Sequence, residues 1–167
     1  MKLNTMKDLY IDQLRDLYSA EDQLISALPK MAQAASSSDL QKAFQDHLGE
    51  TRNQKQRLEQ IFSGLGVVPQ GETCQAMQGL IKEGENIINA QADPTVRDAA
   101  LIAAAQRVEH YEMAGYGSVR TFADELGYSN AKSLLQATLD EEGAADKKLT
   151  SLAQGGMFSS GINQRAI

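Results

Sequence analysis

Apolar side chains recur along this sequence in alternating steps of three and four residues. The first stripe contains Tyr10, Leu14, Leu17, Leu24, Leu28 and Met31. Such spacing places side chains on one face of an α-helix, whereas the period-two alternation of strands is never sustained. A chain of 167 residues suits one domain with a single hydrophobic core. The sequence therefore predicts an all-α fold.

Capping residues and glycines divide the pattern into four long helices and one shorter helix. The helices begin near Thr5, Ser38, Cys74, Pro94 and Ser129, and the last four end near Gly64, Ala90, Gly127 and Ala153. The strongest start signals are the capping boxes Thr5–Asp8 and Ser38–Gln41, and Asp93 as the cap before Pro94. Pro29 lies inside the first stripe, so the first helix is expected to kink or end there.

Two helical hairpins joined by a short crossover helix account for this order of elements. A plain up-and-down bundle would not need about 30 residues between its second and third long helices. We therefore expect a ferritin-like four-helix bundle over residues 1–154. Residues 155–167 begin with two glycines and are polar and rich in Gly and Ser, so they are expected to form a flexible tail.

Charge and composition exclude several classes of protein. The formal net charge is −6 and the sequence contains no basic stripe, which argues against a nucleic-acid-binding protein. No apolar run approaches the roughly 18–20 residues that span a bilayer, and the N-terminus lacks the apolar segment of a signal peptide. The single cysteine, Cys74, cannot form an internal disulfide. We therefore expect a cytoplasmic protein.

Acidic side chains interrupt the apolar stripes near the middle of every long helix. Those on the inward side are Glu21, Glu50, Glu109, Glu112, Glu142 and Asp146, with His47 and Gln54 beside Glu50. A buried, uncompensated carboxylate costs several kcal/mol, and no Lys or Arg shares these faces. Two divalent ions would offset four of the six negative charges, and two trivalent ions would offset all six. This pattern predicts a site for two metal ions.

Several strings around these acids resemble the YciE/YciF family of bacterial stress proteins, within the ferritin-like and rubrerythrin-like group. The strings are LYSAE at 17–21, ALPKM at 27–31, HLGET at 47–51, RDAALIAAAQ at 97–106 and VEHYE at 108–112. Together they extend the resemblance over nearly the whole chain. The resemblance implies a homodimer, a dinuclear metal site, and ferroxidase-like or peroxidase-like chemistry with O2 or H2O2.

The resemblance also assigns ligands by position. Glu21 would be the ligand from the first helix, and Glu109 and Glu112 would be the paired acids of the third long helix. Glu50 and Glu142 would bridge the two metal ions.

The ligand set departs from the group's pattern at two positions. Ferritin-like di-iron proteins carry a histidine three residues after the bridging acid, but Asn53 and Ala145 stand there. The nearest substitutes, Gln54 and Asp146, follow one position later on the same face. An oxygen-rich site favours hard ions, with iron as the first expectation and manganese close behind.

The sequence leaves alternatives for the roles of the histidines and for the function. His47 is either a ligand or a hydrogen-bond partner of a ligand carboxylate, whereas His110 is turned about 100° away from Glu109 and Glu112. Tyr116 lies near the proposed site and is expected mainly to fill the core. The alternatives to an oxidoreductase are a non-catalytic metal-binding protein and a structural dimer whose acids pair with a partner.

Overall fold

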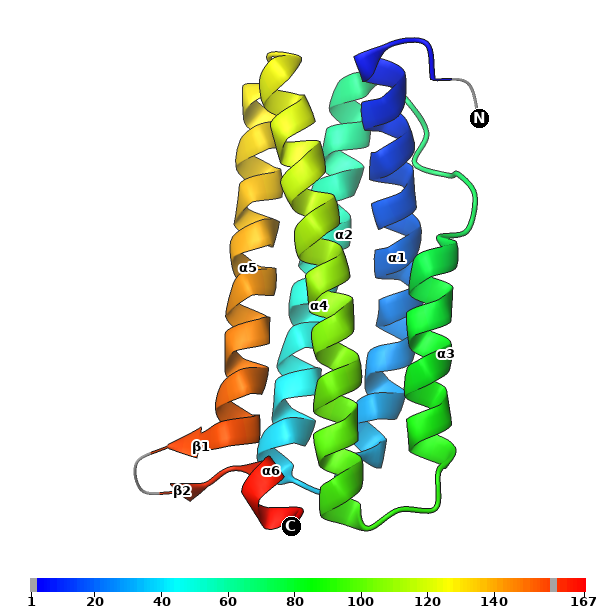
Figure 1. Cartoon of the computed structure of the whole chain (residues 1–167). Coiled ribbons are helices and arrows are strands. Elements are labelled where there is room, and N and C mark those ends of the chain that lie inside the picture. The colour runs from blue at the N-terminus through cyan, green and yellow to red at the C-terminus, as the bar shows by residue number, and fades with distance from the viewer. Residues whose placement is uncertain (1–2, 157–158) are drawn as a thin grey trace.

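The bundle consists of two antiparallel helical hairpins, as seen in a computed structural model that describes residues 3–156 and 159–167. Helix α1 (Met6–Ala34) pairs with α2 (Ser38–Leu65), and α4 (Pro94–Glu125) pairs with α5 (Ser129–Gln154). The shorter α3 (Gln75–Asn89) links the hairpins and packs against α1 and α4 (Figure 1). This confirms the predicted all-α bundle with a crossover helix.

Side-chain caps fix where the helices begin. The Thr5 hydroxyl accepts a hydrogen bond from the Asp8 amide at 3.1 Å, and the Asp8 carboxylate accepts one from the Thr5 amide at 2.9 Å. This capping box was predicted, as was the Asp93 cap, whose carboxylate lies 2.8 Å from the Thr95 amide. The prediction for α2 was wrong by one residue, because its cap is Ser37.

Helix α1 continues past Pro29 to Ala34, so the helix does not end at the proline. A proline inside a helix removes one backbone hydrogen bond. Met31 and Ala32 are buried in the core beyond it, and their packing offsets that loss. Tertiary packing therefore overrides the local stop signal.

The apolar core is divided into two clusters, and every long helix contributes to both. One cluster contains Leu24, Leu28, Leu40, Phe44, Leu101 and Leu149 among others. The second contains Tyr10, Leu14, Leu58, Tyr116 and Leu135 among others. Along each long helix, the change from one cluster to the other falls at buried polar residues: Glu21 in α1, His47 to Gln54 in α2, Glu109 and Glu112 in α4, and Glu142 in α5.

The C-terminal segment, predicted to be a flexible tail, contains regular elements where the structure describes it. A two-stranded ladder pairs β1 (Gly155–Gly156) with β2 (Ser159–Ser160), and a single helical turn, α6 (Ile162–Arg165), follows. Ile162 is buried and packs against the first apolar cluster. Among the described residues, no helix is both long and apolar enough to cross a bilayer.

Candidate metal centre

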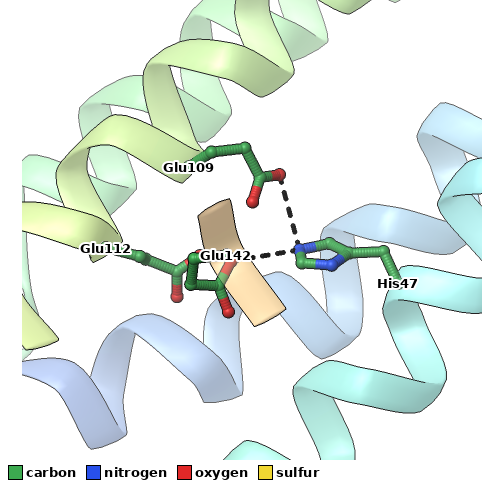
Figure 2. Close-up of side chains that lie close together, drawn as sticks. All are labelled: His47, Glu109, Glu112 and Glu142. Atoms are coloured by element: carbon green, nitrogen blue, oxygen red, sulfur yellow. Dashed lines mark ion pairs between the residues drawn. The ribbon is translucent and has the colours of Figure 1, made fainter. Parts of the chain in front are cut away.

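Four side chains from three helices converge between the two apolar clusters. His47 of α2, Glu109 and Glu112 of α4, and Glu142 of α5 each offer one ligand atom, and these atoms lie within 4.8 Å of one another (Figure 2). Glu109 and Glu112 are three residues apart, which places them on neighbouring positions of one helix face. The geometry is that of a site which could hold a metal ion.

All four residues are shielded from solvent, as is a fourth glutamate. The exposed fraction is 6% for His47, 2% for Glu109, 1% for Glu112 and 0% for Glu142, and Glu21 of α1 is also at 0%. Ionisable side chains are rarely buried to this degree unless they are paired or bind metal. Burial of four glutamates in one place therefore calls for a partner.

Several polar atoms in this centre have no hydrogen-bond partner among the described residues. They are both carboxylate oxygens of Glu112, Oε2 of Glu21, Glu109 and Glu142, and Nε2 of His47. Buried polar atoms are nearly always hydrogen-bonded, and each exception requires a physical explanation. Carboxylate oxygens and an imidazole nitrogen are the donors that iron and manganese accept. The residues present therefore fit a metal ion.

The electrostatics of the centre agree with this geometry. Burial raises the pKa values of Glu21, Glu109, Glu112 and Glu142 above the ordinary value of 4.5. Neighbouring carboxyl groups raise three of these pKa values further. Glu142 raises the pKa values of Glu21 and Glu109, and Glu21 raises the pKa of Glu112. In the absence of a cation, these acids therefore favour their neutral, protonated form.

Two neutral side chains bind carboxylates of the centre directly. The buried Tyr116 hydroxyl donates a hydrogen bond to Oε1 of Glu21. The Gln54 amide donates one to Oε1 of Glu142, and its own Oε1 has no partner within the described ranges. Tyr116, expected mainly to fill the core, therefore also orients Glu21.

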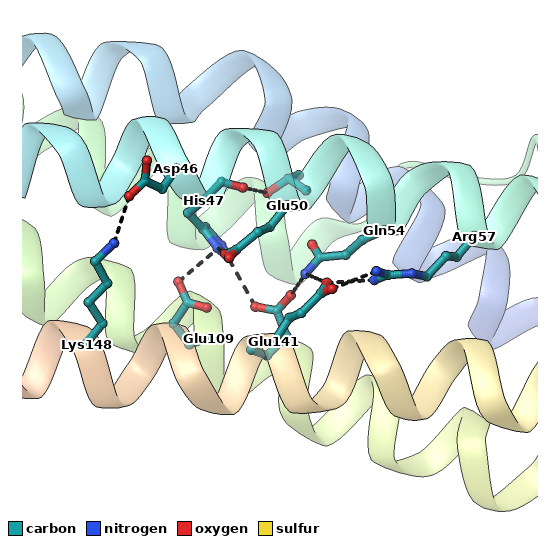
Figure 3. Close-up of polar contacts among 10 residues, drawn as sticks. Asp46, His47, Glu50, Gln54, Arg57, Glu109, Glu141 and Lys148 are labelled. Atoms are coloured by element: carbon teal, nitrogen blue, oxygen red, sulfur yellow. Dashed lines mark hydrogen bonds and ion pairs between the residues drawn. The ribbon is translucent and has the colours of Figure 1, made fainter.

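One basic residue lies closer than the sequence predicted. Two nitrogens of the Arg57 guanidinium lie 2.6 Å from the two carboxylate oxygens of Glu141, at one end of the centre (Figure 3). This bidentate pair neutralises Glu141, which directly precedes Glu142 in α5. No Lys or Arg of the described residues forms an ion pair with the four buried glutamates, and His47 is the basic side chain within ion-pair distance of Glu109 and Glu142.

Four sequence-predicted ligands lie outside the four-residue cluster: Glu21 and Gln54, which are buried, and Glu50 and Asp146, which are partly exposed. Glu50 has a 45% exposed side chain, and its Oε2 lies 3.3 Å from Nδ1 of His47. This contact lowers the pKa of Glu50. Asp146 has a 21% exposed side chain and accepts a hydrogen bond from Gln106 at 3.0 Å.

The two histidines occupy different environments. His47 reaches Glu50 with one ring nitrogen, while its Nε2 lies 3.4 Å from Glu109 and 3.8 Å from Glu142. One ring nitrogen therefore contacts a carboxylate, and the other faces the clustered acids. The His110 side chain is 67% exposed, in agreement with its predicted position off the face of Glu109 and Glu112.

Comparison with known proteins gives one family and one curated relative. The family described as "Domain of unknown function (DUF892)" matches residues 5–166. Protein YciF of Escherichia coli K12 is 49% identical over 154 residues, which cover 92% of this chain and 93% of YciF.

Solved structures with the same fold include close and distant sequences. The crystal structure of the E. coli stress protein YciF superposes with a TM-score of 0.88 at 48% identity, covering 90% of this chain and 95% of that chain. YcfI of Rhodopseudomonas palustris superposes with a TM-score of 0.88 at 46% sequence identity, covering 91% of this chain and 97% of that chain. A Xanthomonas campestris protein, XCC3681, superposes with a TM-score of 0.71 at 16% sequence identity, covering 88% of this chain and 89% of that chain. At this low identity the match supports the fold alone. The predicted ferritin-like bundle is confirmed by these matches.

Proposed function

The chain belongs to the DUF892, or YciF, family, and on that premise we propose that it is a stress-response protein which holds two iron or manganese ions at the centre of its bundle. The observation that carries the proposal is the group of buried, unpartnered donor atoms on Glu21, Glu109, Glu112, Glu142 and His47. Four ionised glutamates carry four negative charges, which two divalent cations would balance. The charge of the four buried acids thus equals that of two divalent ions, whereas the six acids counted from the sequence would exceed it by two.

The donor atoms divide into two overlapping groups. His47, Glu109, Glu112 and Glu142 form the compact cluster and would hold one ion. Glu21 contributes an unpartnered buried oxygen, and the pKa values of Glu21 and Glu112 are both raised by a neighbouring carboxylate of the group, Glu142 and Glu21 respectively. We assign the second ion to Glu21 with Glu112 and Glu142.

Three further sequence-predicted ligands stand around these groups. The unpartnered Oε1 of Gln54 is available to an ion beside Glu142. Asp146 and Glu50 are engaged by Gln106 and His47 respectively, so they would act at the edge of the centre.

The donor chemistry favours iron, with manganese as the close alternative. Five candidate donors are four carboxylates and one imidazole, a set suited to hard or borderline divalent ions rather than to copper or a structural zinc site. When bound, iron or manganese supplies one-electron chemistry toward O2 or H2O2. The chain's own residues bury the glutamates, hold two of them in place through Tyr116 and Gln54, and accept protons on the carboxylates.

Metal content is the direct test of the proposal. Protein purified without chelator and loaded with Fe(II) or Mn(II) should contain about two ions per chain by elemental analysis. Glu142→Gln should reduce this content, whereas Asp140→Asn, an exposed acid two residues away on α5, should leave it unchanged. A wild-type chain that stays metal-free after loading would refute the proposal.

A non-catalytic metal-binding protein is the second candidate, and the donor set is the reason. With one imidazole in an otherwise all-oxygen set, the centre also suits redox-inert Mg(II) or Ca(II). Stopped-flow absorbance after mixing Fe(II)-loaded protein with H2O2 separates the two. If the bound Fe(II) is oxidised faster than free Fe(II), the result supports an oxidoreductase. If the two oxidation rates are equal, the result supports metal storage or a structural ion. The homodimer implied by the resemblance stays a prediction, which light scattering would check.

A further inference from the structure

A cavity of about 90 Å³ opens between α2 and α5 beside the metal centre. Its lining includes Phe44, His47 and Glu50 from α2, Glu109 from α4, and Ala145 and Lys148 from α5. Figure 3 shows these two helices side by side, with the labelled polar residues in the space between them. The cavity therefore joins residues of the buried centre to residues of the surface.

The inner and outer walls differ in exposure. At the inner wall, His47 and Glu109 are 6% and 2% exposed, and each presents an atom without a hydrogen-bond partner in the described part of the chain. At the outer wall, the side chains of Asp46, Glu50 and Lys148 are 40–49% exposed. Carboxylates thus line the cavity from its mouth to the centre.

An ion pair spans the mouth of the cavity. Nζ of Lys148 on α5 lies 3.0 Å from Oδ2 of Asp46 on α2 (Figure 3). Lys42 also contacts Asp46, at 2.7 Å, but from the same helix. The Lys148 contact is therefore the one that crosses between the two helices. Exposed pairs of this kind are weak and open readily.

We propose that this cavity is the entrance through which divalent cations reach the buried centre, with Asp46 and Glu50 as the first carboxylates that an incoming ion meets. The inference rests on the proposed metal-binding function. Glu50 is suited to the task because it is half exposed and already contacts His47, whose Nε2 faces Glu109 and Glu142. The ammonium group of Lys148 repels cations, and displacement of its contact with Asp46 opens the path.

A second cavity near the centre does not suit a cation. It lies among α1, α3 and α4, and apolar side chains such as Leu24, Met31, Ile81 and Val108 dominate its lining. An ion losing its hydration shell needs oxygen or nitrogen donors along its path. The cavity between α2 and α5 supplies them.

The rate of Mn(II) uptake tests the proposal. Apoprotein is mixed with Mn(II) in a stopped-flow instrument with a fluorescent indicator of free Mn(II), and final content is measured by elemental analysis. Ala145→Phe, which fills the cavity, should slow uptake several-fold without changing the final content. Ala114→Phe, an exposed alanine of α4 outside the cavity lining, is the matched control and should leave the rate unchanged.

Charge reversal at the mouth gives an independent measurement. Lys148→Glu removes the ion pair with Asp46 and adds negative potential, so it should speed uptake by about tenfold at low salt. The gain should shrink in high salt because the exposed charges are screened. If Ala145→Phe and Lys148→Glu both bind two ions at the wild-type rate, the cavity is not the entrance, while the proposed metal centre stands. A wild-type chain that binds no Mn(II) or Fe(II) would overturn both.

Discussion

Glu112→Gln should stabilise the metal-free protein at pH 7 and abolish its stabilisation by metal. Neither carboxylate oxygen of Glu112 has a hydrogen-bond partner in the described structure, so the substitution breaks no contact. Burial raises the pKa of Glu112, and repulsion from Glu21 adds to the shift. Glutamine keeps the shape of the side chain and removes the ionisation.

The pKa shift sets the size and the pH dependence of the effect. A raised folded-state pKa means that the folded protein binds more protons than the unfolded chain, so its stability is lost as the pH rises above the unfolded value of 4.5. At pH 7 the loss cannot exceed 2.303RT times the difference between 7 and 4.5, which is about 3 kcal/mol. At roughly 2–4 °C per kcal/mol for a chain of this length, the variant should gain up to about 10 °C in Tm.

Thermal unfolding in chelator at pH 4.5 and pH 7 measures this effect. The wild type and Glu112→Gln should nearly coincide at pH 4.5, where the folded wild-type carboxyl keeps its proton and the unfolded one is only half ionised, and they should diverge at pH 7. Glu72→Gln, an exposed loop acid, should follow the wild type at both values. A Glu112→Gln protein that is less stable than the wild type at pH 7, or whose gain in stability is independent of pH, would show that Glu112 does not carry a destabilising charge in the folded protein.

Three further outcomes follow from the structure. Binding of Mn(II) should release protons and stabilise the fold more at pH 7.5 than at pH 5, because the buried glutamates with raised pKa values must ionise to bind it; calorimetry in two buffers measures the protons. Asp98→Ala should lower the free energy of unfolding in urea by roughly 2–4 kcal/mol, because Asp98 accepts hydrogen bonds of 2.7–2.8 Å from Ser36 and Ser37 at the α1–α2 turn. Gly66→Ala should cost about 1 kcal/mol in the same assay, since Gly66 ends α2 with a φ of 66°.

The sequence predicted the helices because local and tertiary signals agree along most of the chain. Apolar periodicity located all four long helices, and the Thr5 and Asp93 caps located two starts to the residue. The errors occur where these signals conflict. Ser37 and Ser38 both suit a cap, and only the turn geometry selects Ser37. Pro29 is a local stop signal that core packing overrides.

The candidate site was predictable to the level of helix faces. Periodicity placed Glu21, Glu109, Glu112 and Glu142 inward, and all are buried. It also placed Glu50 inward, but a residue at the edge of an apolar face can turn either way, and Glu50 lies half exposed beside His47. Contacts between distant segments leave no periodic signal, so the pairing of Arg57 with Glu141 could not be foreseen.

The four clustered donors come from both hairpins, so the candidate site forms only when the two hairpins pack together. Neither hairpin presents a complete set of ligands, since His47 belongs to the first and Glu109, Glu112 and Glu142 belong to the second. Under the proposed function, a nascent chain on the ribosome therefore has no complete ligand set until α5 has been synthesised and docked. Ions would then bind to an assembly that the apolar clusters have already formed, so metal scarcity would leave the fold intact and lower its stability.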